Sequence, residues 1–195
     1  MRILTAILLL ALAGFPAAPG LAADPAAVAK IHGGIVDCVG CNLSGADLTN
    51  TCVKEHDLHD ANFDGANATL MCMSFANFTN ASFRGTELSG ANLMNTCVKE
   101  HDLHNADFDG ADATLMCMSF ANFTNASFRG TELSGANLAG AKLDGADLTG
   151  ARTSITSFLG TDLRHVKGLT QAQLDVACGD NKTLLPPGLK IHTCR

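Results

Sequence analysis

A five-residue repeat runs without a break through residues 36–165 of this 195-residue chain. Each unit opens with a small residue, continues with a polar one, and has Leu or Phe at its centre before two polar or glycine positions. One such unit is Ala46-Asp47-Leu48-Thr49-Asn50. Neither the 3.6-residue period of an α-helix nor the two-residue period of a β-strand gives this spacing. The period therefore predicts a repeat architecture in which successive units share one core.

The first 23 residues stand apart from the repeat. A charged start is followed by an apolar stretch over residues 3–15 and by small residues up to Ala23. This order is typical of a signal peptide, and no later stretch approaches the roughly 20 apolar residues of a membrane span. No cysteine precedes Cys38, so none near the cleavage region can carry a lipid. The sequence predicts an exported chain, periplasmic or extracellular, without a membrane anchor.

Acidic residues are concentrated on the repeat. Residues 36–165 contain 16 Asp and Glu against 7 Lys and Arg, a net charge of −9. Because phosphate binding needs clustered cations, this balance disfavours nucleic acid as a ligand. Tyr and Trp are absent, which removes the residues that most often anchor interfaces and stack on bases.

A long duplication lies inside the repeat. Residues 51–95 recur as residues 96–140, and 40 of the 45 positions are identical. Because 45 residues are nine units of five, the copy keeps the frame of the repeat. An insertion out of frame would have misaligned the core.

Units of the form Ala, Asp or Asn, Leu, followed by two further residues, occur at residues 91–95, 136–140 and 146–150. On these units the chain resembles pentapeptide-repeat proteins, over about two thirds of its length. The resemblance implies an all-β solenoid, a right-handed quadrilateral β-helix in which four units form one square coil. The 26 units of residues 36–165 would then form about 6.5 coils.

In this fold, residues 20 apart stack on successive coils, about 4.8 Å from one another. Their central side chains form columns inside the coils, each contributing roughly 1.5–3 kcal/mol before entropy is subtracted. Ala68 and Ala113 are small for central positions, and a local bulge that substitutes Leu70 and Leu115 for them is one way to fill the core. The two columns that we expect are Leu43, Phe63, Phe83, Leu103, Phe123, Leu143 and Leu163, and Cys38, Leu58, Phe78, Val98, Met118, Leu138 and Phe158.

The segments beside the repeat are expected to cover its ends, because open strand edges of a solenoid promote aggregation. Residues 24–35 form the expected N-terminal cap and residues 166–195 the C-terminal one. In the latter, Thr170 predicts the start of a helix over residues 171–178, which Gly179 ends. The apolar residues expected to cover the last coil are Leu169, Leu174, Val176 and Ala177.

All eight cysteines are expected to pair, because thiols oxidise in exported proteins and the count is even. Cys52 and Cys72 are 20 residues apart in the same outward position, as are Cys97 and Cys117. The coil rise of about 4.8 Å lies within the Cα separation that a disulfide requires. Each bond would close a loop of about 20 residues and stabilise the fold by roughly 3 kcal/mol. The other expected pairs are Cys38 with Cys41 and Cys178 with Cys194.

The motif Thr-Cys-Val-Lys-Glu-His-Asp-Leu-His occurs at residues 51–59 and again at residues 96–104. Its sulfur and imidazole groups suit copper or zinc, the one cofactor class that the sequence suggests. The competing interpretation is structural: His56 and His101 occupy the position of the small residue, where each is expected to bulge at a corner, and paired cysteines cannot bind a metal. The candidate ligands are Cys52, Glu55, His56, His59, Cys97, Glu100, His101 and His104.

The sequence contains no arrangement of nucleophile, base and orienting acid and no phosphate or dinucleotide motif, so we expect no catalytic residue and no enzyme. The first hypothesis is an exported structural and interaction module without a cofactor, whose flat β faces bind a protein partner or a second copy. The second is a copper or zinc protein that sequesters its metal. A third rests on family analogy alone: an acidic DNA mimic that inhibits topoisomerases, against which the leader argues.

Overall fold

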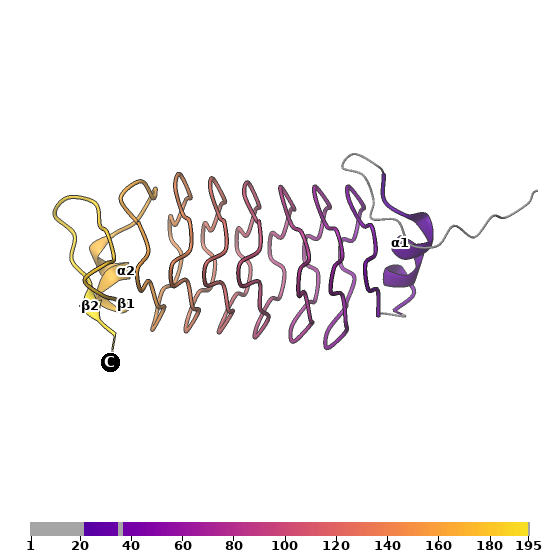
Figure 1. The fold of residues 1–195 in the computed structure, drawn as a ribbon, viewed down its shortest axis with the longest axis horizontal. Helices are drawn as coiled ribbons and strands as arrows, with labels where there is room; N and C mark the ends of the chain where they lie inside the picture. Colours follow the sequence, from indigo (N-terminus) through magenta and orange to yellow (C-terminus); the bar gives the residue numbers. More distant parts are fainter. Residues whose placement is uncertain (1–21, 35–36, 195) are drawn as a thin grey trace, which may run out of the picture.

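The computed structural model describes residues 22–34 and 37–194. Figure 1 shows square coils stacked along the long axis, with α1 at one end and α2, β1 and β2 at the other. These elements are α1 (Pro25–His32), α2 (Gln171–Asp175), β1 (Cys178–Gly179) and β2 (His192–Thr193). Residues 1–21, most of the expected leader, and residues 35–36 of the expected cap and repeat start lie outside the described residues. No helix in the described part of the chain is long and apolar enough to cross a membrane.

The coils are held together by parallel bridges between residues 20 apart, from Asn42 with Asn62 to Asp147 with Lys167. At the first of these, Leu43 N donates to Asn62 O at 2.7 Å and Asn62 N donates to Cys41 O at 2.8 Å. Each unit contributes one bridge and then turns, so the sides of the coil are too short to form extended strands. The 20-residue stacking predicted from the repeat is confirmed.

The corners of the coils depend on the fifth residue of each unit. From residue 40 to residue 160, every fifth residue has a φ between +55° and +71°. Glycine adopts this left-handed conformation without strain and asparagine with little, which explains why these two types dominate the position. The turn closes when the first residue of the next unit donates its N–H to the preceding central carbonyl, as Ala46 N does to Leu43 O at 3.0 Å.

The core consists of the central residues together with the small first residues. Every member of the two expected columns is at most 1% exposed. The rings of Phe63 and Phe83, one coil apart, stack with centroids 4.7 Å apart, and Phe78 meets Phe63 edge to face at 5.7 Å. The predicted arrangement of the core is therefore confirmed.

The expected bulge at Ala68 and Ala113 is wrong. Both alanines are fully buried at the central position, whereas Leu70 and Leu115 are 56% and 55% exposed. No shift of register occurs, because Leu70 occupies a corner in the left-handed conformation. Met71 and Met116 supply apolar volume instead: both occupy the first position of the following unit and are fully buried.

Helix α1 covers the first coil. The side chain of Asp24 accepts a hydrogen bond from Ala26 N at 2.9 Å, and Pro25 occupies the first helical turn, where a missing N–H costs nothing. Ala27 and Ile31 are buried in the common core. Asp24 N donates to Asn42 O at 2.8 Å, so the first coil does not expose this carbonyl.

Helix α2 covers the last coil but is shorter than expected. Thr170 and Gln173 form a capping box, and the Gln173 side chain also donates to Leu148 O and Ala151 O at 2.8 and 3.0 Å. The prediction that the helix continues to Cys178 is wrong, because Cys178 starts β1. The expected cover by Val176 is also wrong, since this side chain is 52% exposed, whereas Leu174 and Ala177 are buried and Leu169 is partly buried.

The exit from the last coil gives a testable prediction. A Cβ on Gly168 would lie 2.7 Å from both Cα and N of Thr149, whereas a Cβ on Gly110, at a similar positive φ, would meet nothing within 4 Å. We expect Gly110→Ala to lower the free energy of unfolding by about 1 kcal/mol through the left-handed conformation alone. Gly168→Ala should cost roughly 1–3 kcal/mol more, because backbone must move. Urea denaturation measures both, and equal losses would contradict the clash.

Candidate functional site

The first copy of the nine-residue motif is dispersed over separate contacts. His59 Nδ1 lies 2.8 Å from Asp57 Oδ1, and His56 Nδ1 lies 3.4 Å from Asp37 Oδ1. Glu55 forms an ion pair of 3.3 Å with Lys54. Cys52 is bonded to Cys72, with Cα atoms 4.4 Å apart.

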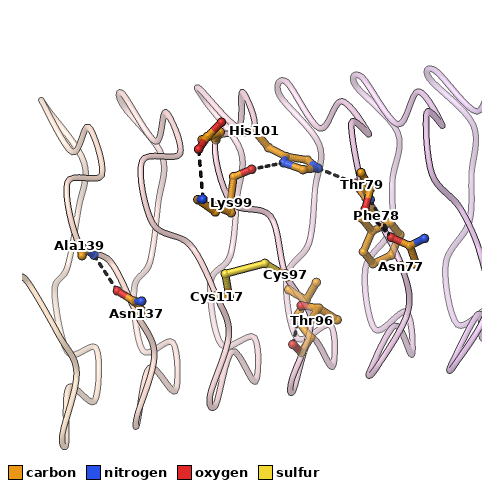
Figure 2. Close-up of a disulfide and its surroundings, with 12 residues drawn as sticks. Asn77, Phe78, Thr79, Thr96, Cys97, Lys99, His101, Cys117, Asn137 and Ala139 are labelled. Carbon is orange, nitrogen blue, oxygen red and sulfur yellow. Dashed lines mark hydrogen bonds and ion pairs between the residues drawn. A yellow bond between two sulfur atoms is a disulfide. The ribbon is translucent and has the colours of Figure 1, made fainter.

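The second copy repeats this dispersal with one change, at His101. Cys97 is bonded to Cys117 on the neighbouring coil, Glu100 pairs with Lys99 at 3.3 Å, and His104 Nδ1 lies 2.9 Å from Asp102 Oδ1. Figure 2 shows the disulfide joining two coils while the His101 ring extends towards the coil on the other side. There its Nε2 contacts Phe78 O, and its Nδ1 contacts Lys99 O at 2.8 Å.

His101 acts as a link between coils. Several threonines in the same first position donate their hydroxyls to the carbonyl 23 residues earlier, as Thr86 does to Phe63 O at 2.8 Å and Thr131 to Phe108 O at 2.7 Å. His101 and Phe78 are also 23 residues apart. The imidazole therefore takes the place of a threonine hydroxyl, and no bulge interrupts the coil.

The structure does not bring the metal-ligand candidates together. In residues 22–34 and 37–194, no group of three or more His, Cys, Asp or Glu side chains is placed to hold a metal ion. Both candidate cysteines are in disulfides. The histidines contact carboxylates or backbone carbonyls of their own or a neighbouring coil.

All eight cysteines are paired in the structure. Besides the two bonds between coils, Cys38 is bonded to Cys41 at a Cα separation of 5.4 Å, and Cys178 to Cys194 at 4.8 Å. The last of these fixes β2 to β1.

The flat faces present polar ladders whose side chains already bond to one another. Asn77 Nδ2 donates to Asp57 Oδ1 at 2.8 Å, and Asn122 makes the same bond to Asp102 one duplication later. The hydrogen bond from His59 lowers the pKa of Asp57, and the same bond raises the pKa of His59.

Apolar side chains gather at the corners instead. Five bulky apolar residues occupy the left-handed fifth position, where such side chains are strained, and all five are more than half exposed. They are Leu70, Phe75, Leu115, Phe120 and Ile155.

Three of these residues share one edge of the solenoid, which we call the apolar edge: Phe75, Leu115 and Ile155, with exposed fractions of 52%, 55% and 77%. They are 40 residues, or two coils, apart, about 10 Å along the axis. A Cβ on Gly135, the corner residue between the last two, would lie 2.6 Å from Leu115 Cδ2, so the leucine covers this glycine. The apolar surface between Leu115 and Ile155 is therefore more continuous than the separation of about 10 Å between these residues suggests.

The duplication placed Leu115 on this edge. A shift of 45 residues is two coils and one further side, so Leu115, the copy of Leu70, moves from one edge to the next and arrives on the edge of Phe75. These residues are not among those predicted from the sequence to form a site. An apolar side chain at the fifth position, where Gly, Asn and Asp prevail, is the signal that identifies them.

Comparison with protein families matches the chain to the model described as pentapeptide repeats, in eight copies over residues 41–74, 72–110 and 117–152, more than half of its length. No curated protein matches significantly.

Several solved structures are similar to the chain. One is a trypsin-treated form of QnrB1, a plasmid-mediated fluoroquinolone resistance protein, with 23% identity over 73% of this chain and 79% of that chain and a TM-score of 0.32. HetL, a pentapeptide repeat protein from the cyanobacterium Nostoc involved in heterocyst differentiation regulation, has 20% identity over 80% and 92%, with a TM-score of 0.27. A pentapeptide repeat protein of the Arabidopsis thaliana thylakoid lumen has 26% identity over 73% and 81%, with a TM-score of 0.23.

The pairing of His59 with Asp57 predicts a pH effect. The raised pKa of His59 means that, while Asp57 is ionised, this pair stabilises the fold fully below the unfolded histidine pKa of about 6.5, and that the contribution is lost as the pH rises through the folded pKa of His59. Asp57→Asn should return the pKa of His59 towards its ordinary value, whereas Asp37→Asn should leave it in place. NMR titration of the His59 ring measures both, and equal responses would contradict the assignment.

The disulfides between coils give a second prediction. Cys97→Ser/Cys117→Ser should lower the free energy of unfolding by about 3 kcal/mol, because the bond closes a loop of 20 residues. Urea denaturation without reductant measures the loss, and thiol titration of the unfolded wild type should find no free thiol. Free Cys52 and Cys97 together with bound copper or zinc would instead support the metal hypothesis.

Proposed function

Since this chain belongs to the pentapeptide-repeat family, we propose that it is a non-enzymatic, exported interaction module that binds a protein partner along its apolar edge. The observation that carries the proposal is the row of Phe75, Leu115 and Ile155, exposed and left-handed. Bulky residues in this conformation cost stability, and aligned exposed apolar side chains are typical of binding surfaces. A role in binding explains why these residues are kept despite the loss of stability and why they lie in one row.

The edge is a better contact surface than the flat faces, which the sequence analysis favoured. Ladder side chains such as Asn77 and Asp57 are already hydrogen-bonded to one another, so a partner would have to replace satisfied bonds. At the edge, apolar surface is removed from water without such a loss.

Export is supported by the pattern of the first 23 residues and by the pairing of all eight cysteines. Disulfides persist in oxidising compartments and are rare in the cytosol. We therefore propose a periplasmic or extracellular location.

The two alternative functions have less support. A copper or zinc site would require the candidate histidines and cysteines to leave the partners described above. For a DNA mimic, the acidic surface should be free of counter-charges, but Arg84 pairs with Asp64, and Arg152 lies 3.3 Å from Glu132.

The duplication supplies a matched test of the apolar edge. Phe75→Asn/Leu115→Asn removes two side chains from the edge, and the control Leu70→Asn/Phe120→Asn makes the same chemical changes at the duplicated positions on other edges. Asparagine tolerates the left-handed conformation, so neither variant should lose stability in urea denaturation. We expect pull-downs from the extracytoplasmic extract to lose their main partner, identified by mass spectrometry, only with the first variant.

Two outcomes would contradict the proposal: capture of the same partner by both variants at wild-type level, or equal loss with both.

A further inference from the structure

At the C-terminal end, β2 extends the stack by one level beyond the last coil. Ser157 bridges Cys178 in β1, and β1 pairs in parallel with β2, with Cys178 opposite His192. Figure 1 shows this pair of strands at the end of the molecule opposite α1. Both residues of β2 are exposed.

The outer edge of β2 offers backbone groups. Cys194 N donates to Gly179 O at 3.0 Å, so the backbone of Cys194 faces β1. Successive residues of a strand direct their N–H and C=O groups to opposite edges, which turns those of Thr193 away from β1. Among the described residues, no hydrogen bond to these two groups is found.

This edge is held firmly in place. The disulfide between Cys178 in β1 and Cys194, the residue after β2, ties the two strands together. The Gln171 side chain accepts a hydrogen bond from Lys190 N and donates one to Lys190 O, both at 3.0 Å. A segment that binds here therefore meets a preorganised strand, which lowers the entropic cost of binding.

A hollow of about 720 Å³ lies beside this strand. Its lining includes Ile155 and Val176, which are 77% and 52% exposed, together with His192 of β2. Asp175 also lines it, with its Oδ1 accepting a hydrogen bond from Gln171 Nε2 at 2.7 Å. The hollow thus combines apolar walls with an acidic group.

We propose that the outer edge of β2 binds an extended segment of a partner protein by strand addition, with an apolar side chain in the hollow and a basic residue near Asp175. Backbone hydrogen bonds to Thr193 supply the pairing, and the hollow supplies the selectivity. A second copy of this chain fits less well, because the apolar residues beside its own β2, Leu189 and Ile191, are partly buried against its own core. The inference rests on the proposed function only in that the segment belongs to a protein partner.

The test uses the full chain, purified without reductant, and a phage-displayed library of random heptapeptides as the probe. We expect the selected peptides to alternate apolar with basic or polar residues. Fluorescence anisotropy of a labelled selected peptide then compares Thr193→Pro, which removes the outward N–H, with Thr193→Ala, which keeps it. We expect roughly tenfold weaker binding for the proline variant and little change for the alanine variant. Val176→Asn, which removes the apolar side chain from the wall of the hollow without adding charge, should also weaken binding.

The outcomes separate this proposal from that of the apolar edge. Phe75→Asn/Leu115→Asn should bind the peptide as the wild type does, because neither residue lines the hollow. The proposal is overturned if no peptide is enriched, if the proline and alanine variants bind equally, or if size-exclusion chromatography shows a dimer that Thr193→Pro dissociates. Denaturation midpoints of both Thr193 variants control for loss of the C-terminal cap.

Discussion

The rest of the structure depends on the hydrogen-bonded register between residues 20 apart. Each coil is hydrogen-bonded to the coils on either side, as Asn62 N donates to Cys41 O on the preceding coil and Phe63 N donates to Ser82 O on the following one, so no coil can change its length without breaking bonds on both. This register places every central side chain inside. It also requires the chain to turn each fifth residue through a positive φ. The buried core and the tight corners thus follow from the same constraint. The central residue of each unit must have a large side chain to fill the core, whereas the corner residue must have a small one or none.

The same constraint explains why the duplicated segments, identical at 40 of 45 positions, make different contacts. The in-frame shift of 45 residues preserves the core and rotates each copied residue to the next side of the coil. His101 reaches the carbonyl of Phe78 on the preceding coil, whereas His56, at the start of the second coil, contacts Asp37 in the first. Leu70 and Leu115 likewise lie on different edges. A residue's contacts in this fold are set by its place in the stack as much as by its unit.

The sequence predicts most of the fold because a Leu or Phe that recurs at every fifth position can be buried in only one way. Phe63, Phe83 and Phe123 are buried where the period places them. It predicts the corners less well, since the same apolar preference suggested that Leu70 and Leu115 would turn inward. Inter-coil hydrogen bonds cost more to break than an exposed leucine costs to keep. The predicted length of the C-terminal helix is wrong for a related reason. Helix α2 ends early because the residues from Cys178 continue the stack as a strand. This pairing is a tertiary interaction, which local helix signals in the sequence do not contain.

The apolar edge is evidence of function because the register requires a positive φ at each of its positions, where bulky side chains are disfavoured. Selection for stability alone would place Gly or Asn at residues 75, 115 and 155, as at most other corners, and the core would be unchanged. Ile155 is the strongest evidence for a functional edge. It lies outside the duplicated segments, so its side chain did not arise by duplication. Its β-branched isoleucine is also the type least suited to a positive φ. Two independent origins, the duplication and Ile155, thus supply apolar side chains to one edge at a two-coil spacing, and a common partner along that edge explains their coincidence better than drift does.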